Sequence, residues 1–191
     1  MFKINIFNIS SIKLYFPLRD RKKQLKFVTN CNVIEGLLNL ELNDYDYILI
    51  TKSTKDRLSI GCHLSSRFFY GGIFSKLKIG IINLPSESYR LKEKEYDYLE
   101  RKLSPSGMII SLLDFDKTGR AGAKYLLETY NIPYIFITRG EFGLPNYGAK
   151  DFADLHSKYT IDDINQFIKE TYTYLKIKYE TESFKDLPFT Y

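Results

Sequence analysis

Short apolar runs alternate with amphipathic segments between residues 45 and 138. The apolar runs predict buried strands at 47–51, 78–83, 108–113 and 134–138. The segments that follow the first three runs predict helices at 53–64 and 91–103, and a third that begins among the small residues after Asp116 and runs to about Tyr130. Because strands that alternate with helices form βαβ units, we expect an α/β fold with a central, mainly parallel four-stranded sheet.

The flanking segments carry different patterns. Residues 1–44 hold short alternations of apolar and polar positions, which predict a β-rich N-terminal subdomain. Thr160 and Asp163 have the spacing of a capping box and predict a C-terminal helix. Glycine and proline within residues 139–150 predict a mobile loop. The expected organisation is a subdomain at 1–44, a main domain with its C-terminal helix at 45–179, and an irregular tail at 180–191.

Composition limits the classes of protein that fit this pattern. A chain of 191 residues that is 44% hydrophobic can bury a sizeable core, and its net charge of +5 suits a polyanionic partner. Cys31 and Cys62 lack metal-ligand spacing, which excludes a zinc ribbon and favours a reduced, cytoplasmic protein. His63 and His156 also lack such spacing, so we expect them to be satisfied or surface histidines. No apolar stretch approaches the roughly 20 residues that cross a bilayer, so no membrane partner is expected.

Two aspartates, Asp114 and Asp116, follow the predicted strand at 108–113. Residues at i and i+2 of an extended segment point the same way, so both carboxylates can face one point beyond the strand. Open α/β sheets bind their ligands at that edge. Two carboxylates held together need a cation, and Mg²⁺ is a hard ion that suits such oxygens. The alternative is a turn in which aspartate caps the next helix.

Further charged residues occupy comparable places along the chain. Lys52 and Lys55 follow the predicted strand at 47–51, where ammonium groups would suit phosphate. Asp151 and Asp154 follow the glycine-bearing loop and add a second pair of carboxylates. For each pair, the alternative is an ordinary solvated start of a helix.

Three ordered motifs resemble those of the Toprim domain, which primases, topoisomerases and some nucleases share. The second motif, Asp114-Phe-Asp116-Lys-Thr-Gly119-Arg-Ala-Gly122-Ala123, is a good match to that family. The likeness is greatest to the catalytic core of phage-type DNA primases, without their zinc-binding or helicase domains, and runs from Lys26 to Ile168. Its other segments are Lys26-Phe-Val-Thr-Asn30 with Gly36 and Leu37, Ile50-Thr-Lys52-Ser53-Thr-Lys55-Asp56, Asn83-Leu-Pro85-Ser86-Glu87 and Lys150-Asp151-Phe-Ala-Asp154.

The resemblance implies a Toprim (Rossmann-like) fold and metal-dependent nucleotidyl or phosphoryl transfer with Mg²⁺ or Mn²⁺. The implied metal ligands are Asp114, Asp116, Asp151 and Asp154. The implied catalytic residues are Asp114, Asp116, Glu87 and Lys52. The residues implied to bind phosphate or nucleic acid are Lys52, Lys55, Lys150, Arg19, Arg21, Lys22 and Lys23. For the last four of these, the alternative is a solvated basic loop.

One position departs from the family's pattern. Lys52 stands where the first Toprim motif usually has a glutamate that serves as a base or a metal-site acid. Our hypothesis is that Glu87, just beyond the second predicted strand, supplies the missing carboxylate. Asp56 is expected to orient a lysine.

The function implied by the resemblance is RNA primer synthesis by a primase-like nucleotidyltransferase in phage or mobile-element DNA replication. The expected partners are a single-stranded DNA template and nucleotides, together with a helicase or another replication protein. Two alternatives remain open. One is a Toprim nuclease that hydrolyses phosphodiesters, and the other is a catalytically inactive Toprim module that binds nucleic acid or the replisome.

Overall fold

The structure is a computed structural model. It describes residues 13–15, 18, 27–29, 33–65, 76–86, 88–137, 148–149 and 151–181. The chain divides into two compact units, residues 1–34 and residues 35–191, and we describe each by itself. These units do not define functional domains, so the domain limits at 44/45 and 179/180 stay a prediction.

The N-terminal unit contains a small antiparallel sheet. Strand β1 (Lys13–Tyr15) pairs with β2 (Phe27–Thr29), and Leu14 lies opposite Val28. Within the described residues of this unit, these two strands form the sheet, and a β-rich subdomain over residues 1–44 stays a prediction. The basic residues predicted to contact nucleic acid lie outside the described residues: Arg19, Arg21, Lys22 and Lys23.

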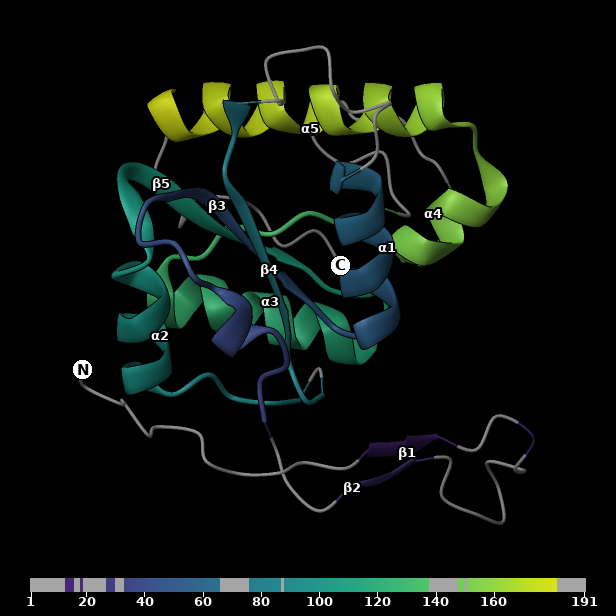
Figure 1. Ribbon diagram of the computed structural model, residues 1–191, viewed down its shortest axis with the longest axis horizontal. Coiled ribbons are helices and arrows are strands. Elements are labelled where there is room, and N and C mark those ends of the chain that lie inside the picture. The colour runs from purple at the N-terminus through teal and green to yellow at the C-terminus, as the bar shows by residue number, and fades with distance from the viewer. Residues whose placement is uncertain are drawn as a thin grey trace. The chain divides into compact units, whose positions relative to one another are not determined.

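A parallel sheet forms the centre of the second unit (Figure 1). Strand β3 (Tyr45–Thr51) lies between β4 (Ile79–Asn83) and β5 (Leu103–Leu112) and runs parallel to both. The fold is thus α/β with a parallel sheet, as the alternating pattern predicts. Parallel pairing also brings the carboxyl ends of all three strands to the same edge.

The predicted fourth strand, 134–138, is wrong for the residues that can be compared. Within the described part of the chain the sheet has three strands, and Tyr134 makes a single parallel bridge to Ser111. Residues 134–137 are nonetheless all buried, and residue 138 lies outside the described part. An apolar run reports burial, and here the burial is achieved without a continuous hydrogen-bonded ladder.

The boundary between the second helix and the third strand also differs from the prediction. Helix α2 spans Glu93–Glu100, and β5 already begins at Leu103, where the prediction had a helix to 103 and a strand from 108. Pro105 and Gly107 masked the early part of this strand, because both residues are unfavourable inside a sheet. β5 lies at an edge of the described sheet, where a proline is tolerated.

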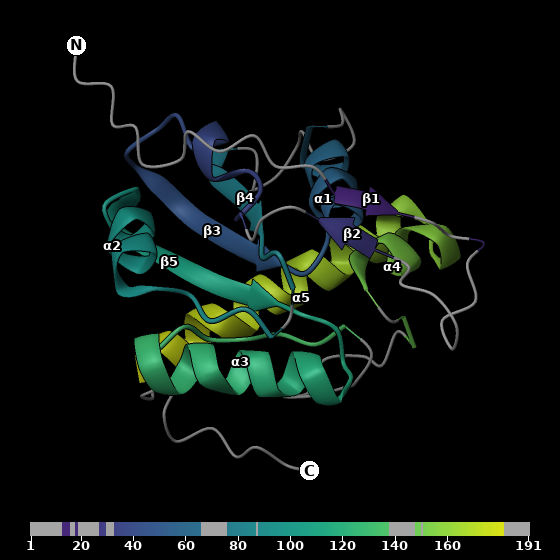
Figure 2. The ribbon, with the colours of Figure 1, turned by 90° about the horizontal axis from the view of Figure 1, so that it is seen from below.

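Helices cover both faces of the sheet (Figure 2). The helices on one face are α1 (Thr54–Ser65), α4 (Phe152–Lys158) and α5 (Ile161–Thr181), while α2 and α3 (Lys117–Tyr130) cover the other. A short 3₁₀ helix, η1 (Leu37–Asn39), precedes β3. The start of α5 confirms the predicted capping box, since the Asp163 amide donates to Thr160 Oγ1 and the Thr160 amide donates to Asp163 Oδ2.

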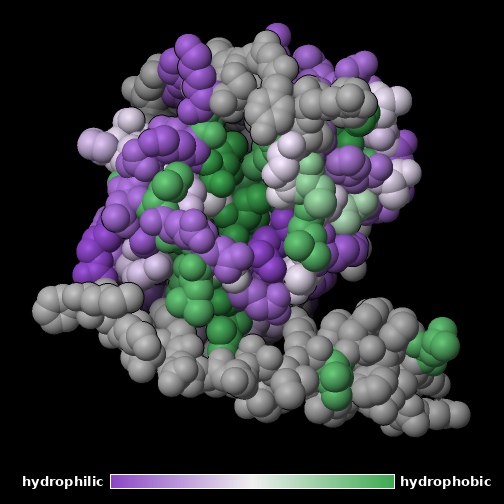
Figure 3. All heavy atoms as spheres, in the orientation of Figure 1, coloured by the Kyte–Doolittle hydropathy of each residue, from purple (hydrophilic) through white to green (hydrophobic). Residues whose placement is uncertain are grey.

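Burial on both faces explains why β3 lacks a polar side. Ile48 and Ile50 are fully buried on one face, and Leu49 points into the opposite layer beneath α5. In the space-filling view, apolar residues lie in the middle of the visible face and hydrophilic residues border them (Figure 3). None of the described helices is long and apolar enough to span a bilayer.

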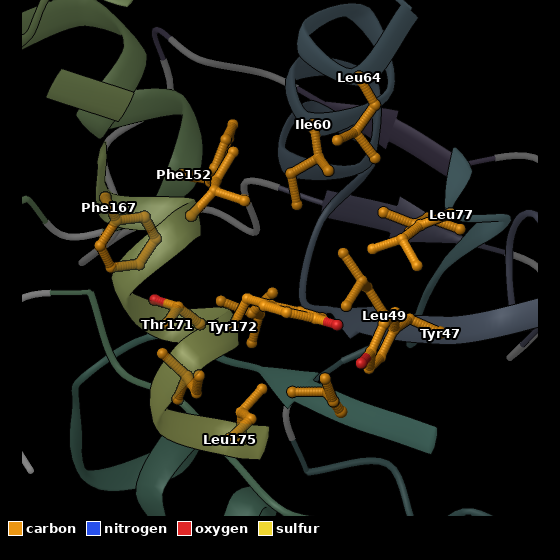
Figure 4. A pocket seen from close by; sticks show the side chains of 15 residues that line it. Tyr47, Leu49, Ile60, Leu64, Leu77, Phe152, Phe167, Thr171, Tyr172 and Leu175 are labelled. Carbon is orange, nitrogen blue, oxygen red and sulfur yellow. The ribbon is translucent and has the colours of Figure 1, made fainter. Parts of the chain in front are cut away.

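A small apolar cavity lies between α5 and the sheet (Figure 4). Its volume is about 90 Å³, and Ile60 of α1 and Phe152 of α4 form part of its wall. Tyr47 and Tyr172 meet at it with ring centroids 6.0 Å apart. Burial, assisted by Tyr172, raises the pKa of Tyr47 to about 12, so this phenol stays neutral at physiological pH.

Candidate metal centre

The carboxyl ends of β3 and β5 lie next to each other, because Thr51 pairs with Leu112 in the parallel register. The chain continues from β3 through Lys52 and Ser53 into α1, and from β5 to Asp114. Side chains that are distant in sequence therefore meet at one edge of the sheet. This is the edge at which open α/β sheets bind ligands.

Three aspartates from different elements converge at this edge. Asp56 lies in the first turn of α1, Asp114 follows β5, and Asp151 is the N-cap residue of α4. One carboxylate oxygen of each lies within 4.8 Å of one oxygen of each of the others. Asp114 is only 2% exposed and Asp56 only 4%. We call Asp56, Asp114 and Asp151 the aspartate cluster.

Local hydrogen bonds fix two of these carboxylates. Asp56 Oδ2 accepts a hydrogen bond from Ser53 Oγ at 2.5 Å, and Asp56 Oδ1 accepts one from the Ala153 amide at 3.2 Å. Asp151 Oδ1 caps α4 by accepting from the Asp154 amide at 2.7 Å. The first turns of α1 and α4 are thus joined at the cluster itself.

Two lysines neutralise part of the charge of the cluster. Lys52 forms an ion pair with Asp114, and Lys55 Nζ lies 2.8 Å from Asp151 Oδ2. Partial burial lowers the pKa of Lys55, but the contact with Asp151 and the charges of Asp56 and Asp114 outweigh it, so the net shift is upward. Lys52 and Lys55, two of the predicted phosphate-binding residues, therefore lie at the cluster, paired with carboxylates.

The environment of Asp56 disfavours its charged form. Burial raises the pKa of Asp56, and the charge of Asp151 adds to the increase, while Ser53, the Ala153 amide and Lys55 act in the opposite direction. The net result is a raised pKa, so ionised Asp56 is held at a cost in free energy. A cation among the three carboxylates would offset that cost.

The donor set and the space fit a small hard cation. Carboxylate oxygens are the ligands that Mg²⁺ prefers, and Mg²⁺ is commonly held by one or two carboxylates with water and phosphate oxygens. A cavity of about 10 Å³ lies among the aspartate cluster, Thr51 and Leu112. That is close to the minimum of about 10 Å³ that a water-sized particle requires. Ile60 and Phe152 close its apolar side.

Asp116, a predicted metal ligand, caps α3 in this structure. Its Oδ1 accepts hydrogen bonds from the amides of Thr118 and Gly119, both at 2.9 Å. The capping alternative drawn from the sequence is therefore realised, and Asp116 is not part of the aspartate cluster. A role for Asp116 as a metal ligand stays a prediction.

Steric crowding explains why the second motif has a glycine at position 119. A Cβ added at Gly119 would lie 2.0 Å from the carbonyl oxygen of Asp114. This close approach lets α3 start directly against the backbone that carries Asp114. The spacing of the motif thus serves the position of Asp114 as well as the cap.

The remaining predicted site residues either are not part of the aspartate cluster or lie outside the described residues. Asp154 forms an ion pair with Lys158 at 2.8 Å and is not part of the aspartate cluster. Glu87 and Lys150 lie outside the described residues, so their predicted roles stay predictions.

Asp56 was expected only to orient a lysine. Its place in the first turn of the helix that follows a parallel strand, at the same edge of the sheet as Asp114, was the signal that could have identified it as a cluster member.

The fold and the site define an α/β protein with an acidic cluster at the carboxyl ends of parallel strands. No protein-family model and no curated protein matches the chain. Among solved structures it is similar to the primase fragment of the bacteriophage T7 primase-helicase protein. The identity is 19% and the TM-score 0.47, over 82% of this chain and 55% of that one. At this level of similarity, a function has to be argued from the site itself.

Proposed function

We propose that the chain is a primase-like Toprim protein that catalyses Mg²⁺- or Mn²⁺-dependent nucleotidyl transfer during DNA replication. The observation that carries this proposal is the convergence of Asp56, Asp114 and Asp151 at the carboxyl edge of the parallel sheet. The Toprim-like motif from Asp114 to Gly119 supports it, because its glycine has a packing role at this edge. The Toprim form of the α/β fold is part of the proposal.

The aspartate cluster would hold the first divalent ion. Asp116 and Asp154 would contribute to a second ion, which triphosphate oxygens would bind for the most part. A bound divalent ion supplies charge stabilisation for the phosphate oxygens and activates an attacking hydroxyl group. The raised pKa of Asp56 means that ion binding also favours the deprotonated, ligating form of this carboxylate.

Lys52 and Lys55 would bind the phosphates of the substrate. Both ammonium groups pair with carboxylates of the cluster, and Lys55 is 62% exposed. A divalent ion at the cluster would compete with them for these carboxylates, so the lysines would turn to the phosphate oxygens of a nucleotide. Lys150 would assist them, and Glu87 would supply the carboxylate that the family's first motif usually provides.

The proposed reaction is RNA primer synthesis on a single-stranded DNA template. Ribonucleotides would be the substrates, and a helicase or another replication protein would be a further partner. The basic residues Arg19, Arg21, Lys22 and Lys23 would contact the phosphate backbone of the template, which would make binding strongly salt-dependent.

A calorimetric titration with Mn²⁺ tests the metal site. Asp114→Asn should weaken Mn²⁺ binding by about tenfold or more, because it removes a buried ligand. Asp162→Asn is the matched control, since Asp162 is exposed in the first turn of α5 and not part of the cluster. Equal affinity of Asp114→Asn and the wild-type protein would contradict the proposal.

Incubation with single-stranded DNA, ribonucleotides and Mg²⁺ tests the reaction itself. Extended products that Asp114→Asn does not form are expected of a primase. Shortened DNA would instead identify a nuclease, which uses the same carboxylates to hydrolyse phosphodiesters.

One observation favours a second candidate, a catalytically inactive module that binds nucleic acid or a replication protein. The Lys52–Asp114 and Lys55–Asp151 pairs neutralise much of the cluster from within the chain. A protein that binds DNA but shows neither Mn²⁺ binding nor product formation would support this candidate over the primase.

A further inference from the structure

Three polar side chains from three helices meet between α1, α4 and α5, away from the aspartate cluster. His63 of α1 is only 3% exposed. Its Nδ1 lies 3.1 Å from Nε2 of His156 on α4, and its Nε2 lies 3.0 Å from Oδ1 of Asn165 on α5. We call His63, His156 and Asn165 the histidine contact. In Figure 1, α4 lies beside α1, and α5 runs across the top above them.

The hydrogen-bond partners assign the protons of this contact. The Asn165 carbonyl oxygen can only accept, so the proton of neutral His63 lies on Nε2. His63 Nδ1 is then an acceptor, and the Nε2–H of His156 donates to it. Burial lowers the pKa of His63, Asn165 opposes the shift, and the electrostatic effect of His156 lowers the pKa further. The neutral form of His63 that this arrangement requires is therefore the favoured one at neutral pH.

The histidine contact and the aspartate cluster lie at two places along the same pair of helices. Asp56 and His63 share a face of α1, because positions seven residues apart differ by about two turns. On α4, Asp151 is the N-cap and His156 lies near the other end. The rings of His63 and His156 both contact Phe152, with centroids 6.1 and 6.0 Å apart, respectively.

A helix as short as α4, with seven residues, needs more than one attachment to hold its direction. The bond from the Ala153 amide to Asp56 joins α4 to α1 at the first turn. The Lys55–Asp151 ion pair lies at the same end of α4, so beyond that end the direction of the helix depends on the packing of its buried side chains, Phe152 and Leu155. The His156–His63 bond adds a directional attachment to α1 near the other end of α4.

We propose that His63, His156 and Asn165 are positioning residues that hold α4 along α1 and thereby keep Asp151 in the aspartate cluster. The consequence for ion affinity rests on the proposed function. The consequence for the attachment of α4 does not, since it concerns the protein without any ion.

Two substitutions of His156 separate the hydrogen bond from the size of the side chain. His156→Leu removes the donor to His63 Nδ1, whereas His156→Gln keeps an N–H donor at a similar reach and carries no charge. We expect His156→Leu to weaken Mn²⁺ binding about tenfold, which is the scale for residues that support metal ligands. His156→Gln should restore most of the affinity. Equal Mn²⁺ affinities for His156→Leu and the wild-type protein would overturn the effect on the ion.

A control variant separates positioning from general loss of stability. Leu99 is fully buried in α2, on the other face of the sheet, so Leu99→Ala should destabilise the protein without changing Mn²⁺ affinity. If Leu99→Ala weakened Mn²⁺ binding as much as His156→Leu, the positioning role would be overturned.

Amide hydrogen exchange in EDTA gives a readout that needs no ion. In His156→Leu, the Ala153 amide should exchange at least about tenfold faster, because its bond to Asp56 opens more often, while the amide of Ile48 in β3 should be unaffected. Unchanged protection of Ala153 would overturn the positioning proposal. If the wild-type protein bound no Mn²⁺, the proposed function would fail, but the exchange rates would still decide whether the histidine contact holds α4.

Discussion

Asp56 combines a cost in stability with the proposed capacity to bind an ion. The residue is buried beside Asp151, and its pKa is raised above the ordinary value of 3.8. A carboxyl group whose pKa is raised in the folded state makes its full contribution to stability at pH values below the ordinary pKa. This contribution is lost as the pH rises through the folded-state pKa. At neutral pH without metal, ionised Asp56 should therefore destabilise the fold.

Asp56→Asn should accordingly stabilise the metal-free protein at neutral pH, by about 1 kcal/mol, and abolish tight Mn²⁺ binding. The gain should disappear as the pH falls below the ordinary aspartate pKa, where the wild-type carboxyl group is neutral in both states. Thermal unfolding in EDTA at a series of pH values measures the difference. A variant less stable than the wild-type protein at neutral pH would contradict this account of Asp56.

Gly119 permits a close approach that a larger residue would block. Gly119→Ala should destabilise the protein by about 2 kcal/mol or more, because its Cβ would lie 2.0 Å from the carbonyl oxygen of Asp114. Gly61→Ala is the matched control inside α1. Its Cβ would meet nothing closer than Ile81 Cδ1 at 3.9 Å, so it should stabilise the helix by about 0.5–1 kcal/mol. Urea unfolding of both variants is the measurement, and similar effects of the two substitutions would refute the explanation.

At the level of single elements, Asp116 realises the capping interpretation of the sequence at the start of α3. Asp116→Ala should destabilise the protein by about 1 kcal/mol, because the amides of Thr118 and Gly119 lose their acceptor. Asp116→Asn should leave stability nearly unchanged, since asparagine caps equally well. Denaturant unfolding measures both, and an asparagine variant as unstable as the alanine variant would show that the charge, and not the cap, matters.

The alternating pattern predicted β3, β4, α1 and α3 to within a few residues, because each apolar run ends at a clear polar or glycine-bearing boundary. The prediction failed where a buried segment does not pair as a regular strand, and where a paired strand has a sequence that is unfavourable for one. Tyr134 is buried but makes a single β-bridge. Leu103 begins a strand that the sequence did not predict, because Pro105 and Gly107 are unfavourable inside a sheet. Periodicity reports which side chains are buried, whereas the hydrogen-bonded partner depends on the tertiary fold.

For the molecule as a whole, parallel topology made part of the candidate site predictable. Asp114 could be placed from the sequence, because the residue after a parallel strand lies at the ligand-binding edge. The same reasoning applies to Asp56, but the role expected of this residue from the sequence was only that of orienting a lysine. The contact between His63 and His156 could not be predicted, since it depends on how α4 packs against α1, which no local pattern reports.

The most direct test of the aspartate cluster is a crystal structure of the protein with Mn²⁺, which is located by its anomalous scattering. We predict one strong anomalous peak about 2 Å from carboxylate oxygens of Asp56, Asp114 and Asp151, with Lys52 and Lys55 displaced from their carboxylate partners. Saturating Mn²⁺ that leaves both ion pairs intact and gives no peak among the three aspartates would contradict the proposed metal centre.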